Sequence, residues 1–299
     1  MRARVALILA LVAGAASAAT PAPDLAYGAY QRGEFGAALA EALKRVAADN
    51  KDAAAMTLIG EIFKDGAAVK QDNAEAAGWF KLASDLGDAG AAFELGALQI
   101  AGAPGVPADR ASALAQFQRA ADKGVAQAFT NLGIAATQKE GQTPDYTKAA
   151  AYFRKGAEAG DAEAAYSLGE LLREGTGVDK DEAEAAKWLR AAADRHLVEA
   201  EIEFGIMAFN GVGVPADETL AASYLRAAAG RHNPIAENRL AHLYVSGRGA
   251  PKDLVLATVW NELAKGAGLS DASLDRGIGP LSSADDHRAA ELIRAYAAF

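Results

Sequence analysis

Apolar and small residues return in the same order at intervals of 36 or 37 residues along most of this chain. Within each interval, two stretches show the helical spacing of apolar positions, and a short segment rich in glycine or polar residues separates them. A small residue preceded by a large apolar one marks each unit, and these reference positions are Gly60, Gly96, Gly133, Gly169, Gly205 and Ala241. Six copies of one unit predict a repeat protein built from helix pairs over residues 53–268.

Glycine and aspartate separate the two stretches of a unit. A glycine stands six residues after the reference position at Gly66, Gly102, Gly175, Gly211 and Gly247. It predicts the end of the first helix, because glycine adopts the left-handed conformation at little cost. Asp72 and Asp181 then begin second helices, and Glu75 and Glu184 three residues later predict capping boxes. The third unit departs from the pattern, because residues 138–144 replace the glycine segment.

The combined pattern resembles a known repeat. Small, apolar, glycine, aspartate and aromatic positions follow in the order Ala164, Leu168, Gly169, Gly175, Gly177, Asp181, Ala185 and Trp188. This order is similar to the Sel1-like repeat, a relative of the tetratricopeptide repeat, and the resemblance covers residues 53–268. It implies an all-α protein, a right-handed α/α superhelical solenoid used for protein–protein contact. It also implies that the first helix of each pair lines the concave face.

The segments that flank the six units differ from them. Residues 25–52 resemble one tetratricopeptide-like hairpin with a shorter corner. Residues 269–299 form a predicted C-terminal capping segment, whose last helix begins near residues 280–285. Its apolar stripe consists of Ala289, Leu292, Ile293, Tyr296 and Phe299. Such an amphipathic helix is what a solenoid needs to cover its exposed end.

Residues 1–19 have the features of a secretory signal peptide. Arg2 and Arg4 precede an apolar run over residues 5–12, and Ala16-Ser17-Ala18 matches a cleavage signal. The apolar run is shorter than the ~20 residues of a membrane-spanning helix. We therefore expect a periplasmic or secreted protein that is not inserted in the membrane after cleavage. The alternative is an N-terminal helix of the fold.

Composition excludes several classes of function. The formal charge is −9, and removal of Arg2 and Arg4 takes it from −9 to −11, which argues against nucleic acid as a partner. The chain has no cysteine, so it forms no disulfide and carries no lipid-anchor cysteine. Its sequence contains no Ser-x-x-Lys, Gly-x-Ser-x-Gly or His-Glu-x-x-His motif. We therefore expect no catalytic residue, no cofactor and no metal site.

Two of the four histidines stand where other units have glycine. His196 and His232 occupy the position that is Gly87, Gly124, Gly160 or Gly268 elsewhere, at the end of the second helix. The favoured interpretation is that these histidines close their helices in the left-handed conformation, where a cation also suits the helix dipole. The alternative is a pH-sensing role in an acidic compartment.

The concave face is the predicted partner-binding surface. By the resemblance, the residues three before and one or four after the reference position point inward, and these columns vary more than the small-residue columns. The predicted partner-binding residues are Phe93, Ile100, Thr130, Ile134, Tyr166, Glu170, Arg173, Ile202, Ile206, Phe209, Asn238 and His242. Phe93 and Tyr166 remain open to a second interpretation, in which they pack between neighbouring repeats.

Two functions of different class are compatible with the sequence. The first is a non-catalytic periplasmic interaction module that binds a protein or peptide. It resembles Sel1-like proteins that hold the periplasmic domain of a sensor in check, and it could equally serve a secretion or polysaccharide pathway. The alternative is an envelope enzyme or accessory protein that acts on peptidoglycan or β-lactams. The missing catalytic motifs favour the first function.

Overall fold

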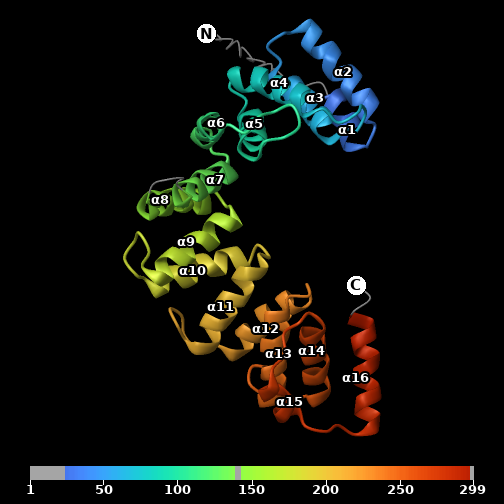
Figure 1. Cartoon of the computed structure of the whole chain (residues 1–299), viewed down its shortest axis with the longest axis vertical. Coiled ribbons are helices and arrows are strands. Elements are labelled where there is room, and N and C mark those ends of the chain that lie inside the picture. The colour runs from blue at the N-terminus through green and yellow to red at the C-terminus, as the bar shows by residue number, and fades with distance from the viewer. Residues whose placement is uncertain (1–23, 139–142, 297–299) are drawn as a thin grey trace, which may run out of the picture.

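The computed structural model describes residues 24–138 and 143–296, and within these ranges the chain is all-helical, with no strand (Figure 1). The predicted signal peptide, residues 1–19, and Phe299 lie outside the described residues. The helices are α1 (Leu25–Gln31), α2 (Phe35–Ala48), α3 (Ala53–Asp65), α4 (Asn73–Asp85), α5 (Ala89–Ala101), α6 (Arg110–Asp122), α7 (Ala126–Thr137), α8 (Tyr146–Glu158), α9 (Ala162–Glu174), α10 (Glu182–Ala193), α11 (Val198–Asn210), α12 (Glu218–Ala229), α13 (Pro234–Ser246), α14 (Leu254–Gly266), α15 (Ala272–Ile278) and α16 (Ser283–Tyr296).

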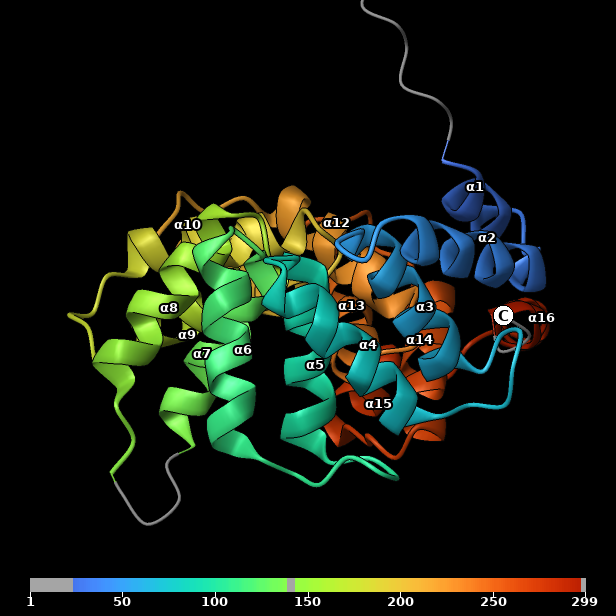
Figure 2. The ribbon, with the colours of Figure 1, turned by 90° about the horizontal axis from the view of Figure 1, so that it is seen from above.

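Consecutive helices pack against one another from α1 to α15, which confirms the predicted α/α solenoid. The tightest pairs are α3 with α4, α5 with α6, α7 with α8, α9 with α10, α11 with α12, and α13 with α14. Figure 1 shows the chain running from α1 at one end of the long axis to α16 near the other. Seen along that axis, it passes from α2 to α8 and α10 on the opposite side and returns to α16 (Figure 2).

The first helix of each pair lies on the inner side of this curve. The backbones of α3 and α5, and those of α7 and α9, approach each other directly, whereas no two second helices of neighbouring pairs approach as closely within the described ranges. In a curved stack, the elements on the inside are the crowded ones. We define the inner face as the surface formed by α3, α5, α7, α9, α11 and α13.

An aspartate closes the corner of every repeat through two groups. Its side chain accepts hydrogen bonds from the first turn of the second helix, as Asp72 and Asp181 do from two N–H groups each. Its own N–H donates to a carbonyl near the end of the first helix over 2.8–3.1 Å, and the six donors are Asp72, Asp109, Asp145, Asp181, Asp217 and Asp253. The predicted capping boxes are therefore wrong in the contact made by Glu75 and Glu184. Each glutamate would accept a hydrogen bond from the aspartate N–H, but that N–H already donates to a carbonyl of the first helix.

Left-handed glycines end the first helices where the sequence predicts them. Gly66, Gly175, Gly211 and Gly247 have φ between 67° and 75° and cap α3, α9, α11 and α13. Gly102 differs, because its ψ of 138° turns the chain into a more extended corner. Helix α7 has no glycine cap and ends at Gln138 with a φ of −112°.

The reference glycines receive a bulky side chain from the second helix of their own repeat. A Cβ atom at Gly60 would lie 2.6 Å from the Phe80 ring, and one at Gly133 would lie 2.5 Å from the Phe153 ring. The column of side chains that fills these spaces is Phe80, Phe117, Phe153, Leu189 and Leu225, all of them buried. The aromatic position expected from the sequence, Trp188 in the fourth repeat, lies one residue before Leu189, so this column was not predicted.

The ends of the solenoid are closed by different means. At the N-terminus, Arg45 on α2 forms ion pairs with Asp24 and Asp52, the residues that cap α1 and α3. At the C-terminus, α16 packs on α14 and its Tyr296 ring lies 4.8 Å from that of Trp260, as expected for a capping helix. The sequence did not predict α15, a short helix that buries Leu274 against the last repeat.

The reference glycines permit a matched test of packing. Ala at a helical glycine gains about 1 kcal/mol in helix propensity, and overpacking costs about 1–3 kcal/mol. A Cβ at Gly169 would lie 2.7 Å from Leu189, whereas one at Gly205 would lie 3.2 Å from Leu225. We expect Gly169→Ala to lower the free energy of unfolding by about 1–2 kcal/mol, and Gly205→Ala to be neutral or stabilising.

Chemical denaturation of the two single variants measures this difference. Both face a leucine, so the comparison isolates the separation of the helices. Equal stability of the two variants would contradict a tight contact at Gly169.

Candidate functional site on the inner face

The predicted partner-binding residues lie on the first helices α5, α7, α9, α11 and α13, but two of them are not accessible. Thr130 is 6% exposed, and its hydroxyl donates to Asp161 over 2.7 Å, which joins α7 to the start of α9. Ile202 is 5% exposed and packs in the core of the last repeats. The prediction that Thr130 and Ile202 contact a partner is therefore corrected: neighbouring repeats cover both side chains.

Phe93 and Tyr166 are half-buried, and both pack against other repeat residues. The Phe93 ring lies 5.8 Å from that of Phe117, within the core between α5 and α6. Tyr166 packs against the core around α9, and burial, with Glu170 and Glu203 nearby, raises its pKa to about 12. These two rings support the helices and offer only part of their surface to the inner face.

Of the apolar residues predicted to bind a partner, Ile100, Ile134, Ile206 and Phe209 are accessible and are not packed in an aromatic pair of the core. Ile134 on α7 is the most exposed of them, at 40%. Ile100, Ile206 and Phe209 are half-buried, and the Arg248 guanidinium lies 4.2 Å from the centre of the Phe209 ring. Ile134 is therefore the apolar side chain best placed to contact a partner.

Two groups of charged residues with the same arrangement lie on the inner face. In each group, a glutamate follows the reference glycine, a cation stands four residues after that glycine, and a second glutamate comes from the next repeat. Lys64 on α3 lies 2.9 Å from Glu94 on α5. Arg173 on α9 lies 2.6 Å from Glu170 and 3.9 Å from Glu203 on α11. We name these groups the charge triads, which are Glu61–Lys64–Glu94 and Glu170–Arg173–Glu203.

Each triad contains two carboxylates and one cation. Burial raises the pKa of Glu61 in the first triad and that of Glu203 in the second, since water hydrates these carboxylates poorly. In the second triad, Arg239 on α13 also acts on Glu203 and lowers its pKa to a smaller extent. Burial disfavours the charged form of both carboxylates, and a cation supplied by a partner would stabilise that form. Glu170 and Arg173 are among the residues predicted from the sequence, whereas the other four members are not. The signal that could have identified them is the position that corresponding members share relative to the reference glycine.

The last repeat ends the inner face with a different polar group. Asn238 and His242 on α13 both contact Asp271, with the His242 Nε2 atom 2.9 Å from the carboxylate. The Ser273 hydroxyl and His242 hold the pKa of Asp271 well below its usual range. Asn238 and His242 thus fasten α13 to the segment before α15.

His196 and His232 end their helices in the left-handed conformation, with φ values of 64° and 57°, which confirms the favoured interpretation. Each also lies near a buried glutamate, with Nδ1 of His196 3.6 Å from Glu201 and Nδ1 of His232 4.0 Å from Glu237. Glu201 and Glu237 are 1% and 2% exposed. Corresponding positions in other repeats hold Ala92, Phe129 and Ala165, so the carboxylates replace apolar residues.

The two buried glutamates differ in their partners. Arg231, which follows the second helix of the same repeat, forms an ion pair with Glu201. The residue that corresponds to Arg231 one repeat later is Ala267, and Oε2 of Glu237 has no hydrogen-bond partner among the described residues. Burial therefore raises the pKa of Glu237, while His232 lowers it to a smaller extent.

Neither metal chemistry nor membrane spanning is suggested by the residues that the structure describes. Within residues 24–138 and 143–296, no three His, Asp or Glu side chains are grouped as metal ligands would be. None of the described helices is long and apolar enough to cross a bilayer.

The geometry defines a class of protein, an α/α solenoid that presents a varied inner face on a uniform framework. The Sel1 repeat model matches residues 53–88, 89–125, 130–161, 162–196, 198–232 and 234–268. These six matches span most of the chain, which belongs to the Sel1 repeat family. Sel1 repeats generally mediate protein–protein contact, and the solenoid they form is typically a non-catalytic scaffold.

Solved structures show the same fold. A protective antigen of uropathogenic Escherichia coli with an SLR fold, c5321, shares 24% identity at a TM-score of 0.74 over 91% of this chain, which spans 59% of that protein's length. A Sel1 repeat protein from Oxalobacter formigenes shares 25% identity at a TM-score of 0.66, over 80% of this chain and 94% of its own. No curated protein matches the sequence significantly.

The unpaired carboxylate of Glu237 predicts a dependence of stability on pH. Its pKa in the folded chain is raised above the usual 4.5, so its contribution to stability is greatest at acid pH and is lost as the pH rises through the raised value. We expect Glu237→Gln to be more stable than the wild type at about pH 7.5 and to lose this advantage at about pH 4.5.

Glu201→Gln is the matched variant for this test. It removes the carboxylate that Arg231 neutralises, so we expect it to be less stable than the wild type at neutral pH. Urea denaturation across the pH range measures both effects. A Glu237→Gln variant that is destabilised at neutral pH would show that the buried carboxylate has an unrecognised partner.

Proposed function

We propose that this chain is an exported, non-catalytic interaction module whose inner face binds a segment of a partner protein. The segment would carry basic residues on either side of an apolar stretch. A domain of an envelope sensor that the module holds in check fits this description, as does a component of a secretion or polysaccharide pathway.

The arrangement of charge on the inner face carries this proposal. The charge triads join repeats one and two and repeats four and five, and the corresponding positions between them hold Ala97, Ile100, Ile134 and other uncharged residues. An extended partner segment would thus meet acid, then an apolar surface, then acid again. Apolar contact supplies affinity, while the triads orient the segment and speed association.

The sequence of residues 1–19 supports the part of the proposal that concerns export. Their basic start, short apolar run and small-residue cleavage signal are typical of a secretory signal peptide. The absence of cysteine means that stability in an oxidising compartment would rest on helix packing alone. Partner proteins of the periplasm or the cell exterior are therefore the ones to test.

Loss of inner-face contacts should weaken partner capture. We expect the triple variant Ile134→Asn, Glu170→Gln, Glu203→Gln to bind a cross-linked periplasmic partner at least about tenfold more weakly, which is about 1.4 kcal/mol. Higher salt should weaken wild-type binding, since the triads attract basic residues. The measurement is quantitative pull-down from periplasmic extract at two salt concentrations.

The outer surface of α10 provides the control. Lys187→Gln with Arg190→Gln changes two exposed charges there and should leave capture intact. Both sets should melt within about 3 °C of the wild type. Undiminished capture by the inner-face variant would refute the assignment of the binding surface, as would loss of capture by the α10 variant.

The position of signal cleavage gives a separate prediction. Cleavage after the small-residue signal at Ala16–Ala18 should produce a mature protein that begins at Ala19 or Thr20. Intact-mass spectrometry of the protein from the periplasm or the medium measures this. Exported protein that retains Met1 would refute the signal peptide.

A further inference from the structure

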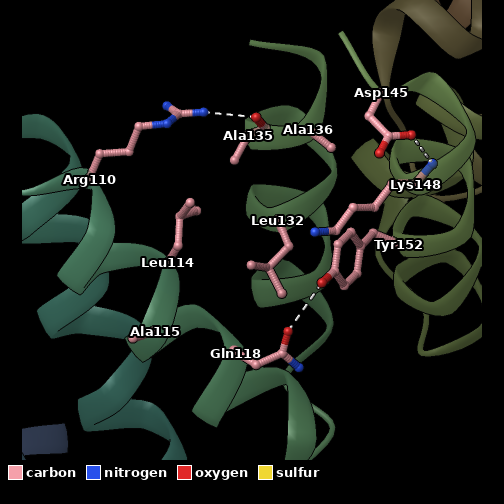
Figure 3. Close-up of a pocket in the computed structure, with 10 residues that line it drawn as sticks. All are labelled: Arg110, Leu114, Ala115, Gln118, Leu132, Ala135, Ala136, Asp145, Lys148 and Tyr152. Atoms are coloured by element: carbon pink, nitrogen blue, oxygen red, sulfur yellow. Dashed lines mark hydrogen bonds between the residues drawn. The ribbon is translucent and has the colours of Figure 1, made fainter. Parts of the chain in front are cut away.

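A cleft on the outer side of the solenoid lies between the second helices α6 and α8 (Figure 3). Its volume is about 360 Å³, within the range of ~300–1,000 Å³ that is usual for small-ligand sites. The floor comes from α7, through Leu132, Ala135 and Ala136, and Leu114 on α6 adds to the apolar lining. The cleft is therefore separate from the inner face.

The position of the cleft coincides with the unusual end of α7. In four other repeats, a glycine between the two helices packs closely against the first turn of the second helix of the preceding repeat. These glycines are Gly105, Gly177, Gly213 and Gly249. At the first turn of α6, the Arg110 side chain instead donates to Ala135 O and Gln138 O, both at 2.8 Å. A cation therefore stands at the edge of the cleft and caps the last turn of α7.

A second cation lies on the opposite wall. Figure 3 shows the Lys148 side chain extending from α8 toward Leu132, and its ammonium lies 5.8 Å from the centre of the Tyr152 ring. The Tyr152 hydroxyl donates to Gln118 Oε1 over 3.2 Å, which fixes the ring against α6. The Lys148 side chain is exposed, and its ammonium thus lies beside the apolar floor of the cleft, where it is free to pair with an anion.

The cleft also contains one carboxylate with spare accepting capacity. Asp145 Oδ1 accepts from the Lys148 backbone N–H over 3.0 Å and so caps α8. Its Oδ2 atom remains available to accept from a ligand N–H group. Among the described residues that line the cleft, two cations stand against one carboxylate, in a chain whose net charge is −9.

We propose that this cleft binds the C-terminal residue of a peptide that ends in a leucine-like side chain. The ligand carboxylate pairs with the Lys148 ammonium, and the ligand side chain covers Leu132 and Ala136. The peptide N–H donates to Asp145. A fatty acid supplies the same carboxylate and apolar chain but has no N–H group for Asp145, which is why the peptide is the better match.

Calorimetric titration of the full chain with three probes tests the proposal. We expect acetyl-Gly-Gly-Leu to bind one site with a Kd below about 1 mM, and its C-terminal amide to bind at least about tenfold more weakly. Hexanoate should also bind at least about tenfold more weakly than the peptide. No saturable peptide binding, or equal binding of the amide, overturns the carboxylate site, and equal binding of hexanoate overturns the peptide as its ligand.

Two lysines on the same helix provide the variant and its control. Lys148→Met should reduce peptide affinity at least about tenfold, because it removes the charge and keeps the apolar stem. Lys155→Met is matched, since the Lys155 ammonium lies 5.9 Å from the Phe129 ring and outside the cleft. Full affinity in Lys148→Met, or an equal loss in Lys155→Met, overturns the site.

The inner-face variant distinguishes this proposal from the proposed function. Ile134→Asn with Glu170→Gln and Glu203→Gln does not alter the lining of the cleft, so it should bind the peptide with wild-type affinity. A loss of peptide affinity in that variant would move the peptide site to the inner face and overturn the cleft.

Discussion

In five of the six repeats, a bulky side chain of the second helix occupies the space that a glycine leaves on the first. A Cβ atom at Gly60, Gly133 or Gly169 would lie less than 3.0 Å from that side chain, so the two helices can meet in only one way. The meeting point determines the length of the corner and the place where an aspartate begins the second helix. Repeated along the chain, the same geometry produces the curve of the solenoid and decides which residues face inward.

The helix pairs could be predicted because their signals are local. Glycine and aspartate act within a single turn of the chain, and each stands at a fixed distance from the reference position. The identity of the packed side chain could not be predicted, since Phe80 follows Trp79 directly and both suit an apolar face. Helix α15 was missed because its seven residues bury only Leu274 and leave no periodic pattern.

The sequence predicted which helices form the inner face, but not which of their side chains are accessible. The inward columns correctly identified the first helices, yet the accessibility of each residue depends on the neighbouring repeat. Thr130 bonds to a residue 31 positions later, and Arg173 contacts Glu203 across 30 residues. Such pairings depend on how the repeats pack in the superhelix, and the spacing of residues within one repeat does not reveal them. The cleft of Figure 3 arises where one repeat departs from the pattern, so only the structure shows its walls together.

The last described helix also changes the character of the surface at its end of the solenoid. Consecutive repeats stack through apolar surfaces, and on α14 that surface includes Val255 and Val259. Helix α16 covers it with Ala289, Leu292 and Ile293 and turns Asp286, Arg288 and Glu291 outward. A single amphipathic helix thus replaces an apolar stacking surface with a charged one.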